Sequence, residues 1–558
     1  MALLVFIATL SYSNHFENTF HFDDSHAVVA NAYIRSLSNF KLFFTDVRTF
    51  SSLPANRSYR PLVTCSLALD YALAGGYKPA YFQASTFFWF LVQLVVMYAL
   101  FRKICDMARP DPRNRWISFF AAALYAVHPA IAETVNYIIQ RGDVYSTLGV
   151  VAALTTYVLL PGYRKFGLYL IPLVLGLLSK PPAMIFPVIL LTYVLLFEET
   201  RFLPALKRCV PAVLVVALLG FVASTLTPVT GIESGYAYRI TQPLVALRYF
   251  RTFFIPNHLT ADSDFDELSS IFEPAALLGF VFVALVVAAA LWCSRLQKWR
   301  PTAFGLWWFL LALFPTAIFP LNEVENDHRM YFPFVGLVLA ATWTVALWLY
   351  GWSPGHRIRT AAIVGTGVLV LVVAVMATRG RNEVWRTDES LWYDVTLKSP
   401  HNGRGLMNYG LTQMEKGDYQ GALDYFERAA VFTPEYPNLE INLGIANGGL
   451  NHDAVAEEHF QRAAELAPDF ADSHYFYARW LNERKRTSEA IAELEQAIAM
   501  NPDYLPAQYL IMEAYSEQAD WPRLRRAAEN TLHRFPGDAT AANSLARANS
   551  SASGGKAQ

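Results

Sequence analysis

Apolar runs long enough to cross a lipid bilayer recur along this chain up to about residue 380. A spanning helix needs about 20 apolar residues and satisfies its backbone hydrogen bonds without water. Charged residues are confined to short connections there, whereas residues 385–540 have the charge density of a soluble domain. We therefore expect an all-α fold in which a multispan membrane domain precedes a soluble one. The expected spans, eleven in number, are 1–14, 83–101, 116–128, 143–160, 166–179, 182–197, 210–226, 275–293, 302–319, 331–350 and 360–377.

Lys and Arg clusters in the connections predict the orientation of these spans, because cytoplasmic loops carry an excess of both residues. If the N-terminus is cytoplasmic, every cluster falls inside and everything after residue 378 falls outside. The first apolar stretch lacks a basic leader and a small-residue cleavage site, so we expect an uncleaved first span. The clusters occupy 102–115, 164–165, 201–208, 295–300 and 356–359, and the expected external loops are 15–82, 129–142, 227–274 and 320–330.

Composition argues against two classes of protein. The net charge is -1, and no block of Lys and Arg residues could form a basic surface for a phosphate backbone. No nucleic-acid partner is therefore expected. The four cysteines are Cys65, Cys105, Cys209 and Cys293, far apart and in or beside apolar segments. They form no C-x-x-C or Cys/His cluster, so neither a disulfide framework nor a metal site is indicated.

An acidic pair, Asp23-Asp24, follows the first span within Phe20-His21-Phe22-Asp23-Asp24-Ser25-His26. Adjacent carboxylates repel, and partial desolvation raises their pKa values, so the arrangement favours a chemical role. The alternative is a hydrated loop that orients the first helix. Further ionisable residues lie in the external loops or at span ends, where functional residues of membrane proteins concentrate. They are Arg60, His128, Glu133, Arg141, Asp143, Lys180, Asp262, Asp264, Asp327, His328 and Arg329.

Five prolines in the soluble part, Pro400, Pro434, Pro468, Pro502 and Pro536, are spaced 34 residues apart. This is the period of the tetratricopeptide repeat, a pair of antiparallel helices. We expect about four repeats, the last one degenerate like a capping repeat. The expected domains are 1–380 for the membrane part, 381–540 for the repeats and 541–558 for a disordered tail.

Repeat arrays present a concave surface that suits an extended peptide. Asn408, Asn442, His474 and Tyr475 lie on or near the first helices that line such a surface. We therefore expect them to bind an acceptor, although the same residues could instead cap or solvate helices.

Several motifs resemble one family along nearly the full chain. They are Phe22-Asp23-Asp24, Tyr59-Arg60-Pro61-Leu62, His128-Pro129, Glu133-Thr134-Val135, Arg141 with Asp143, Ser179-Lys180-Pro181, Asp262-Ser263-Asp264 and Tyr331-Phe332-Pro333. The family is that of the transmembrane O-mannosyltransferases that carry tetratricopeptide repeats, with their bacterial relatives. Two departures concern the family's Gly-Arg-Ala-Asp signature, which reads Gln140-Arg141-Gly142-Asp143, and the acid-arginine pair, which reads Asp327-His328-Arg329.

The resemblance implies a C-type membrane glycosyltransferase with a polyprenyl-phosphate-linked sugar as donor and a protein or peptide hydroxyl as acceptor. It places the catalytic acid at Asp23 or Asp24, and we favour Asp23 as the base. The departures leave open whether mannose or another hexose moves. Neutralising the departing phosphate requires cations, for which Arg60, Arg141, Lys180 and Arg329 are the candidates. Supporting roles are expected for His128, Glu133, Asp143, Asp262, Asp264, Asp327 and His328.

Two alternatives come from other classes. A noncatalytic membrane-anchored scaffold of the cell envelope requires the external acids and bases to be structural. A transporter of the lipid-linked sugar requires charge near the midplane of broken helices, whereas charge lies here at span ends. The sequence leaves open a role for a divalent cation. Several motifs are of a bacterial type, which favours a bacterial inner membrane. The repeats are expected on its extracytoplasmic side.

The charge pattern generates a prediction about topology. A reporter that is active only in the cytoplasm, fused after Gln558, should be silent. The basic clusters are expected in the cytoplasm, and the C-terminus is expected on the other side of the membrane. A periplasmic reporter at the same position is the control and should be active. A bright cytoplasmic reporter would show that the span count is wrong by an odd number.

Overall fold

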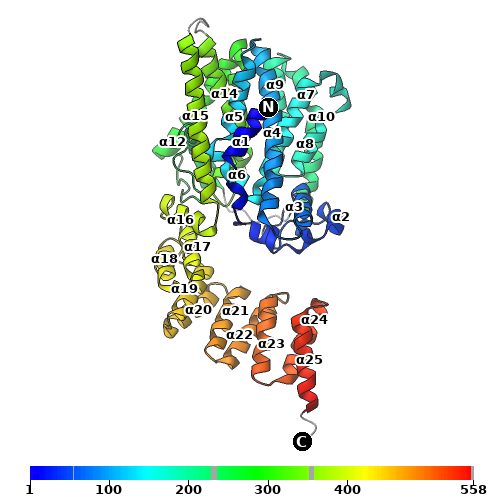
Figure 1. The fold of residues 1–558 in the computed structure, drawn as a ribbon, viewed down its shortest axis with the longest axis vertical. Coiled ribbons are helices and arrows are strands. Elements are labelled where there is room, and N and C mark those ends of the chain that lie inside the picture. Colours follow the sequence, from blue (N-terminus) through cyan, green and yellow to red (C-terminus); the bar gives the residue numbers. More distant parts are fainter. Residues whose placement is uncertain (54–55, 228–234, 351–356, 555–558) are drawn as a thin grey trace. The chain divides into compact units, whose positions relative to one another are not determined.

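The computed structural model describes residues 1–53, 56–227, 235–350 and 357–554. Helices dominate these ranges and no β-strand occurs within them, which confirms the all-α prediction. The chain divides into two compact units, Met1–Asp394 and Val395–Gln558 (Figure 1). The boundary lies beyond the expected residue 380, because helix α15 (Arg357–Val384) runs on past it and α16 (Asp388–Lys398) begins within the first unit.

Seven described helices are long and apolar enough to span a membrane, some with an adjoining short turn. A helix pair, α5 (Asn114–Ala126) with the segment Pro129–Asn136 that contains α6 (Ala132–Asn136), adds an eighth candidate that is bent by 52°. The seven are built on α4 (Pro79–Ala108), α7 (Arg141–Leu159), α10 (Phe202–Leu226), α12 (Pro274–Arg295), α13 (Arg300–Ile318), α14 (Tyr331–Tyr350) and α15.

Each of the expected spans coincides with helix, but several of these helices are short. The short ones are α1 (Ala2–Ser11), α8 (Leu170–Leu177) and α9 (Phe186–Phe197). Ten residues of α-helix rise only about 15 Å, roughly half of a hydrocarbon core. The long apolar helices confirm the membrane character. The count of eleven spans and the orientation stay predictions. Residue 356, at the start of the last basic cluster, lies outside the described residues.

Two helices lie where loops were expected. Helix α3 (Pro61–Ala74) falls in 15–82, and α11 (Tyr236–Phe254) falls in 227–274. Three arginines interrupt the apolar character of α11, so its composition concealed it. The helix nonetheless packs against α12 and α13, and the Tyr238 hydroxyl donates to the Thr316 carbonyl at 2.8 Å.

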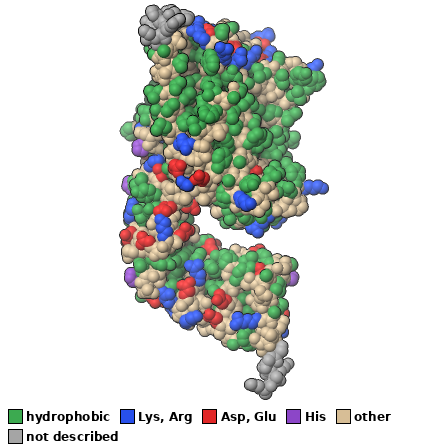
Figure 2. Space-filling view, in the orientation of Figure 1, with side chains coloured by type: hydrophobic (Ala, Val, Ile, Leu, Met, Phe, Trp, Pro, Cys, Tyr) green, Lys and Arg blue, Asp and Glu red, His purple; other side chains and the backbone are tan. Residues whose placement is uncertain are grey.

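Small residues let the membrane helices approach closely. A Cβ atom added at Gly305 of α13 would clash with the backbone of Gly336 of α14, and one at Gly149 of α7 would lie 2.6 Å from Cα of Gly176 of α8. Close approach of this kind is a main source of helix association in membranes, where lipid tails are as apolar as the side chains. Figure 2 shows a broad hydrophobic band over this unit, with Lys and Arg side chains gathered at its upper end.

The second unit consists of four antiparallel helix pairs and a final helix, as the proline period predicts. Between the helices of each pair, one residue has a positive φ: Gly417, Asn451, Lys485 and Ala519, again 34 residues apart. The pairs are α17 (Gly403–Glu415) with α18 (Tyr419–Phe432), α19 (Pro437–Gly449) with α20 (Asp453–Leu466), α21 (Ala471–Glu483) with α22 (Thr487–Met500), and α23 (Leu505–Glu517) with α24 (Trp521–Arg534).

The expectation of a disordered tail over 541–558 is wrong for most of that segment. Helix α25 (Ala539–Gly554) forms there, and its Ala541 and Ala548 are buried in the apolar core of the repeats. The alanines of this segment favour helix, and the last repeat has an apolar face that a further helix can cover. Residues 555–558 lie outside the described residues.

Candidate functional site

The Asp24 carboxylate is fully buried and accepts two backbone hydrogen bonds. The His21 amide donates to its Oδ2 at 3.2 Å, and the Ile139 amide donates to its Oδ1 at 2.9 Å. Burial raises the pKa of Asp24 to about 7, although the two amides and the charge of Arg141 act in the opposite direction. Asp24 therefore ties the loop that follows α1 to the segment that leads into α7.

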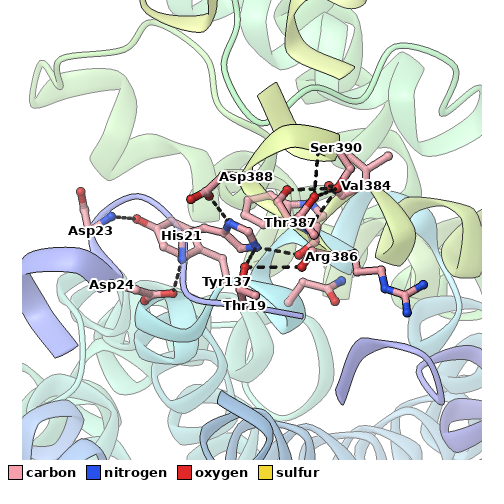
Figure 3. A network of polar contacts seen from close by, with 12 residues as sticks. Thr19, His21, Asp23, Asp24, Tyr137, Val384, Arg386, Thr387, Asp388 and Ser390 are labelled. Atoms are coloured by element: carbon pink, nitrogen blue, oxygen red, sulfur yellow. Dashed lines mark hydrogen bonds and ion pairs between the residues drawn. The ribbon is translucent and has the colours of Figure 1, made fainter. Parts of the chain in front are cut away.

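Asp23 faces the other way. Its side chain is 51% exposed, and its Oδ1 lies 3.2 Å from Nε2 of His26. Its backbone amide donates to the Tyr137 hydroxyl at 2.8 Å, and the carboxylate points away from that hydroxyl (Figure 3). Phe22, the preceding residue, has a φ of +48°, a conformation that is uncommon for a bulky residue and occurs mostly where function requires it. The acid pair thus presents one carboxylate inward and one outward.

Three of the expected cations influence each other at this site. The Lys180 ammonium donates to Asp143 Oδ2 at 2.6 Å and to Gln140 Oε1 at 2.7 Å. Burial lowers the pKa of Lys180, Asp143 raises it, and the charges of Arg60 and Arg329 lower it further. Lys180 therefore lies close enough to Arg60 and to Arg329 to be repelled by both, and we call these three residues the cation cluster.

The cation cluster also reaches the acid pair. Burial lowers the pKa of the Arg60 guanidinium, and the charges of Asp143 and Asp23 oppose that shift. The guanidinium lies over the Phe50 ring, 4.9 Å from its centroid. Arg60 is thus within electrostatic range of the outward-facing carboxylate.

Several arginine donors at the site have no hydrogen-bond partner although they are buried. The Nε atoms of Arg60 and Arg329 are both in this state, while Nη1 of Arg329 donates to the Val324 carbonyl at 3.2 Å. Nε of Arg57 is also buried without a partner, but the charge of this residue acts on Asp46 and not on the cation cluster. Buried donors without acceptors are costly, and an anionic ligand would satisfy them.

Arg141 has a structural environment and not that of a phosphate ligand. It is fully buried, and its Nη1 donates to Asp70 Oδ2 at 2.5 Å. Its Nη2 donates to the Phe82 carbonyl and its Nε to the Ile138 carbonyl. Because all three nitrogens already have protein acceptors, Arg141 is not available to a ligand, and its expected phosphate-binding role needs correction.

Three of the expected supporting residues, Glu133, Asp327 and His328, lie around the turn that carries Arg329. Glu133 Oε1 lies 3.0 Å from Nδ1 of His328, whereas its buried Oε2 lacks a hydrogen-bond partner. Asp327 begins the 3₁₀ turn Asp327–Met330, whose Asn326 side chain accepts from the His328 amide. This turn carries Arg329 of the cation cluster, so these groups border the site.

His128 supports the fold and not the chemistry. Its Nδ1 accepts from the Ala130 amide and its Nε2 faces the Phe253 carbonyl at 2.9 Å, so both ring nitrogens serve the backbone. Asp262 is buried and Asp264 half-buried in the segment between α11 and α12. Among the residues that the structure describes, no group of three or more His, Cys, Asp or Glu side chains is arranged to hold a metal ion.

The expected acceptor-binding residues lie on the first helices of their repeats. Asn408 is half-buried on α17 and Asn442 buried on α19. His474 on α21 places its Nδ1 2.7 Å from Glu493 Oε2, and its Nε2 is buried without a hydrogen-bond partner. Tyr475 packs against the ring of Tyr504.

Comparison with known proteins agrees with this architecture. A tetratricopeptide repeat family model matches residues 393–438 and 443–504. The chain is 22% identical to protein O-mannosyl-transferase TMTC3 of Mus musculus, over 91% of this chain and 60% of that protein. It is 23% identical to the Caenorhabditis elegans protein O-mannosyl-transferase F38B6.6, over 78% of this chain and 63% of that protein. Over a shorter stretch, 28% of this chain and 16% of that protein, it is 33% identical to TMTC1 of Mus musculus.

The resemblance predicted from the motifs is therefore confirmed along most of the chain. The chain spans about three fifths of the length of the TMTC3 relatives that it matches (60% and 61%).

The buried Asp24 generates a prediction about pH. Because its folded-state pKa of about 7 exceeds the ordinary value of 3.8, its contribution to stability is fully present below pH 3.8 and is lost as the pH rises through about 7. Purified Asp24→Asn should therefore gain stability relative to the unsubstituted protein across that range, by at most about 4 kcal/mol. Thermal unfolding in detergent at several pH values measures the difference.

Ser25→Ala, an exposed and non-titrating neighbour, is the control and should keep the original pH dependence. A stability difference between the Asp24→Asn and unsubstituted proteins that did not vary with pH would show that Asp24 remains ionised in the folded protein.

Proposed function

We propose that this chain is a membrane glycosyltransferase that moves a mannose or another hexose from a polyprenyl-phosphate donor to a hydroxyl of a protein or peptide. One observation carries the proposal: an outward-facing carboxylate, Asp23, lies within electrostatic range of Arg60, a member of a half-buried cation cluster that has unsatisfied donors. The names of the relatives, protein O-mannosyl-transferases, support the same reaction class. We further propose that it acts on the extracytoplasmic face of a bacterial inner membrane.

Asp23 is the group that we propose as general base. The acceptor hydroxyl oxygen attacks C1 of the sugar while the bond from C1 to the phosphate oxygen breaks. The hydroxyl proton passes to the Asp23 carboxylate, and the polyprenyl phosphate leaves with the bonding electrons. A single displacement of this kind inverts the configuration at C1. Because Asp24 is buried and anchored by two amides, its role is to hold Asp23 in place.

The leaving phosphate is proposed to bind at Arg60, Lys180 and Arg329. Unsatisfied buried guanidinium donors fit phosphate oxygens, and guanidinium groups bind phosphate in bidentate fashion. Asp143 keeps the Lys180 ammonium in position. Arg141 is left out of this set because its donors serve Asp70 and two carbonyls.

The proposed chemistry predicts different effects for substitutions of Asp23, of the phosphate-binding arginines and of Arg141. Asp23→Asn should lower transfer from a mannosyl polyprenyl phosphate to a peptide by about 10²–10⁴-fold without loss of folding. Arg60→Ala and Arg329→Ala should raise the apparent KM for the donor, whereas Arg141→Ala should lower thermal stability because it leaves Asp70 buried alone. Unaltered turnover in Asp23→Asn would remove the acid pair from the mechanism.

The repeats are proposed to bind the protein acceptor. Truncation after Pro400 retains α16 and removes the array, so transfer to a small hydroxyl acceptor should persist while the apparent KM for a protein acceptor rises, as expected when only binding is lost. A charge-preserving double substitution on the first helices, Asn442→Ala with Asn408→Ala, should shift the same constant in the full chain. Equal efficiency of the truncated and full chains on protein would assign the repeats to assembly.

A further inference from the structure

The corner between α15 and α16 encloses the side chain of His21. This side chain is fully buried, and its Nδ1 lies 2.7 Å from Oδ1 of Asp388, the first residue of α16 (Figure 3). Its Nε2 lies 2.7 Å from the Trp385 carbonyl oxygen. Both ring nitrogens are therefore engaged by a segment that lies more than 360 residues away along the chain.

The backbone of the same residue holds the acid pair. The His21 amide donates to Asp24 Oδ2, so one residue contacts the corner with its side chain and the buried carboxylate with its main chain. The ring also lies edge-on to Trp385, with 5.8 Å between centroids. A displacement of His21 must therefore move Asp24 as well.

Neighbouring contacts join the same two segments. The Thr19 amide donates to the Arg386 carbonyl at 3.3 Å, and Nδ2 of Asn18 donates to the Asn382 carbonyl at 3.3 Å. The Phe22 ring packs against Trp392 of α16, with 4.7 Å between centroids. Phe22 has a positive φ and directly precedes the two carboxylates, so α16 packs against the strained residue of the loop.

We propose that His21 and Asp388 are positioning residues for the transfer reaction, which hold the Asp23-Asp24 loop against the α15–α16 corner. Neither residue has to touch a substrate in this role. The inference rests on the proposed function, because it concerns the geometry of the proposed base.

Asp388 is an informative residue to change because its partner is buried and it is not. Its side chain is 56% exposed, and a pair between two such exposed groups would contribute little. The His21 side chain is fully buried, however, so removal of the Asp388 carboxylate takes away the protein group that holds the Nδ1 side of the ring in place. The substitution itself creates no cavity in the core.

The kinetic experiment compares Asp388→Ala, Asp388→Glu and the control Glu17→Gln in the full chain. Glu17 pairs with Arg386 across the same two segments, but both side chains are more than half exposed. For Asp388→Ala we expect kcat to fall about 10- to 100-fold, the loss that matches one hydrogen bond to a charged group, with both KM values unchanged. Asp388→Glu should recover part of kcat, and Glu17→Gln should match the unsubstituted protein.

Hydrogen–deuterium exchange gives a readout that needs no activity. In Asp388→Ala and His21→Ala, peptides covering residues 19–29 should exchange at least about tenfold faster, because the amides that Asp24 and Tyr137 hold are released. Peptides of α4 and α12 should be unchanged. Thermal unfolding shows whether each variant is still folded. If His21→Ala has lost its fold, the exchange of Asp388→Ala alone tests the positioning role.

The outcomes separate the two proposals. Unchanged exchange over 19–29 in a folded Asp388→Ala would overturn the positioning role, and so would an unchanged kcat. A rise in KM without a loss of kcat would contradict it as well, since it would make Asp388 a binding residue. If the unsubstituted protein transferred no sugar from the donor, the proposed function would fail, while the exchange data would still decide whether the corner holds the loop.

Discussion

Charge buried at the edge of an apolar bundle has to be matched by partners from the fold, and this constraint organises the end of the membrane unit that carries the Asp23-Asp24 loop. Asp24 depends on two backbone amides, Lys180 on Asp143, and Arg141 on Asp70. Each pair joins segments that are distant in sequence, so satisfying the charges also fixes the loops relative to the helices. The helices of the bundle are held by close packing of small residues. The loops are held by these polar contacts.

The acid pair shows how one turn can give adjacent identical residues different properties. The His21 and Ile139 amides hold the Asp24 carboxylate inward, whereas the Asp23 side chain is 51% exposed. An inward carboxylate can anchor a loop but cannot meet a substrate, whereas an outward carboxylate can meet a substrate but needs an anchor. The two acids therefore differ in what they can do, although they are adjacent in sequence.

Much of the fold follows from local sequence, and much of the site does not. The repeats were predictable because a proline period and its small-residue register are local, and helices such as α12 and α14 because they are continuous apolar runs. Helix α11 was missed because its arginines mask a buried face. The cations Arg60, Lys180 and Arg329 could be selected from their positions at span ends. The partner of Arg141 is Asp70 in another helix, and it could not be predicted from the sequence. The contact between His21 and Asp388 could not be predicted either. Such pairings depend on tertiary structure, on which a single sequence carries no direct signal.

The ion pair between Arg141 and Asp70 also bears on how the protein is made. Asp70 lies within the short apolar helix α3 and is synthesised 71 residues before the arginine that neutralises it. Until α7 is made, that carboxylate has no guanidinium to pair with, and burying an unpaired charge is too costly. Helix α3 can therefore take its final place only once α7 is present, so the order of synthesis and the order of assembly differ. The ion pair thus makes the docking of an early helix depend on a later one.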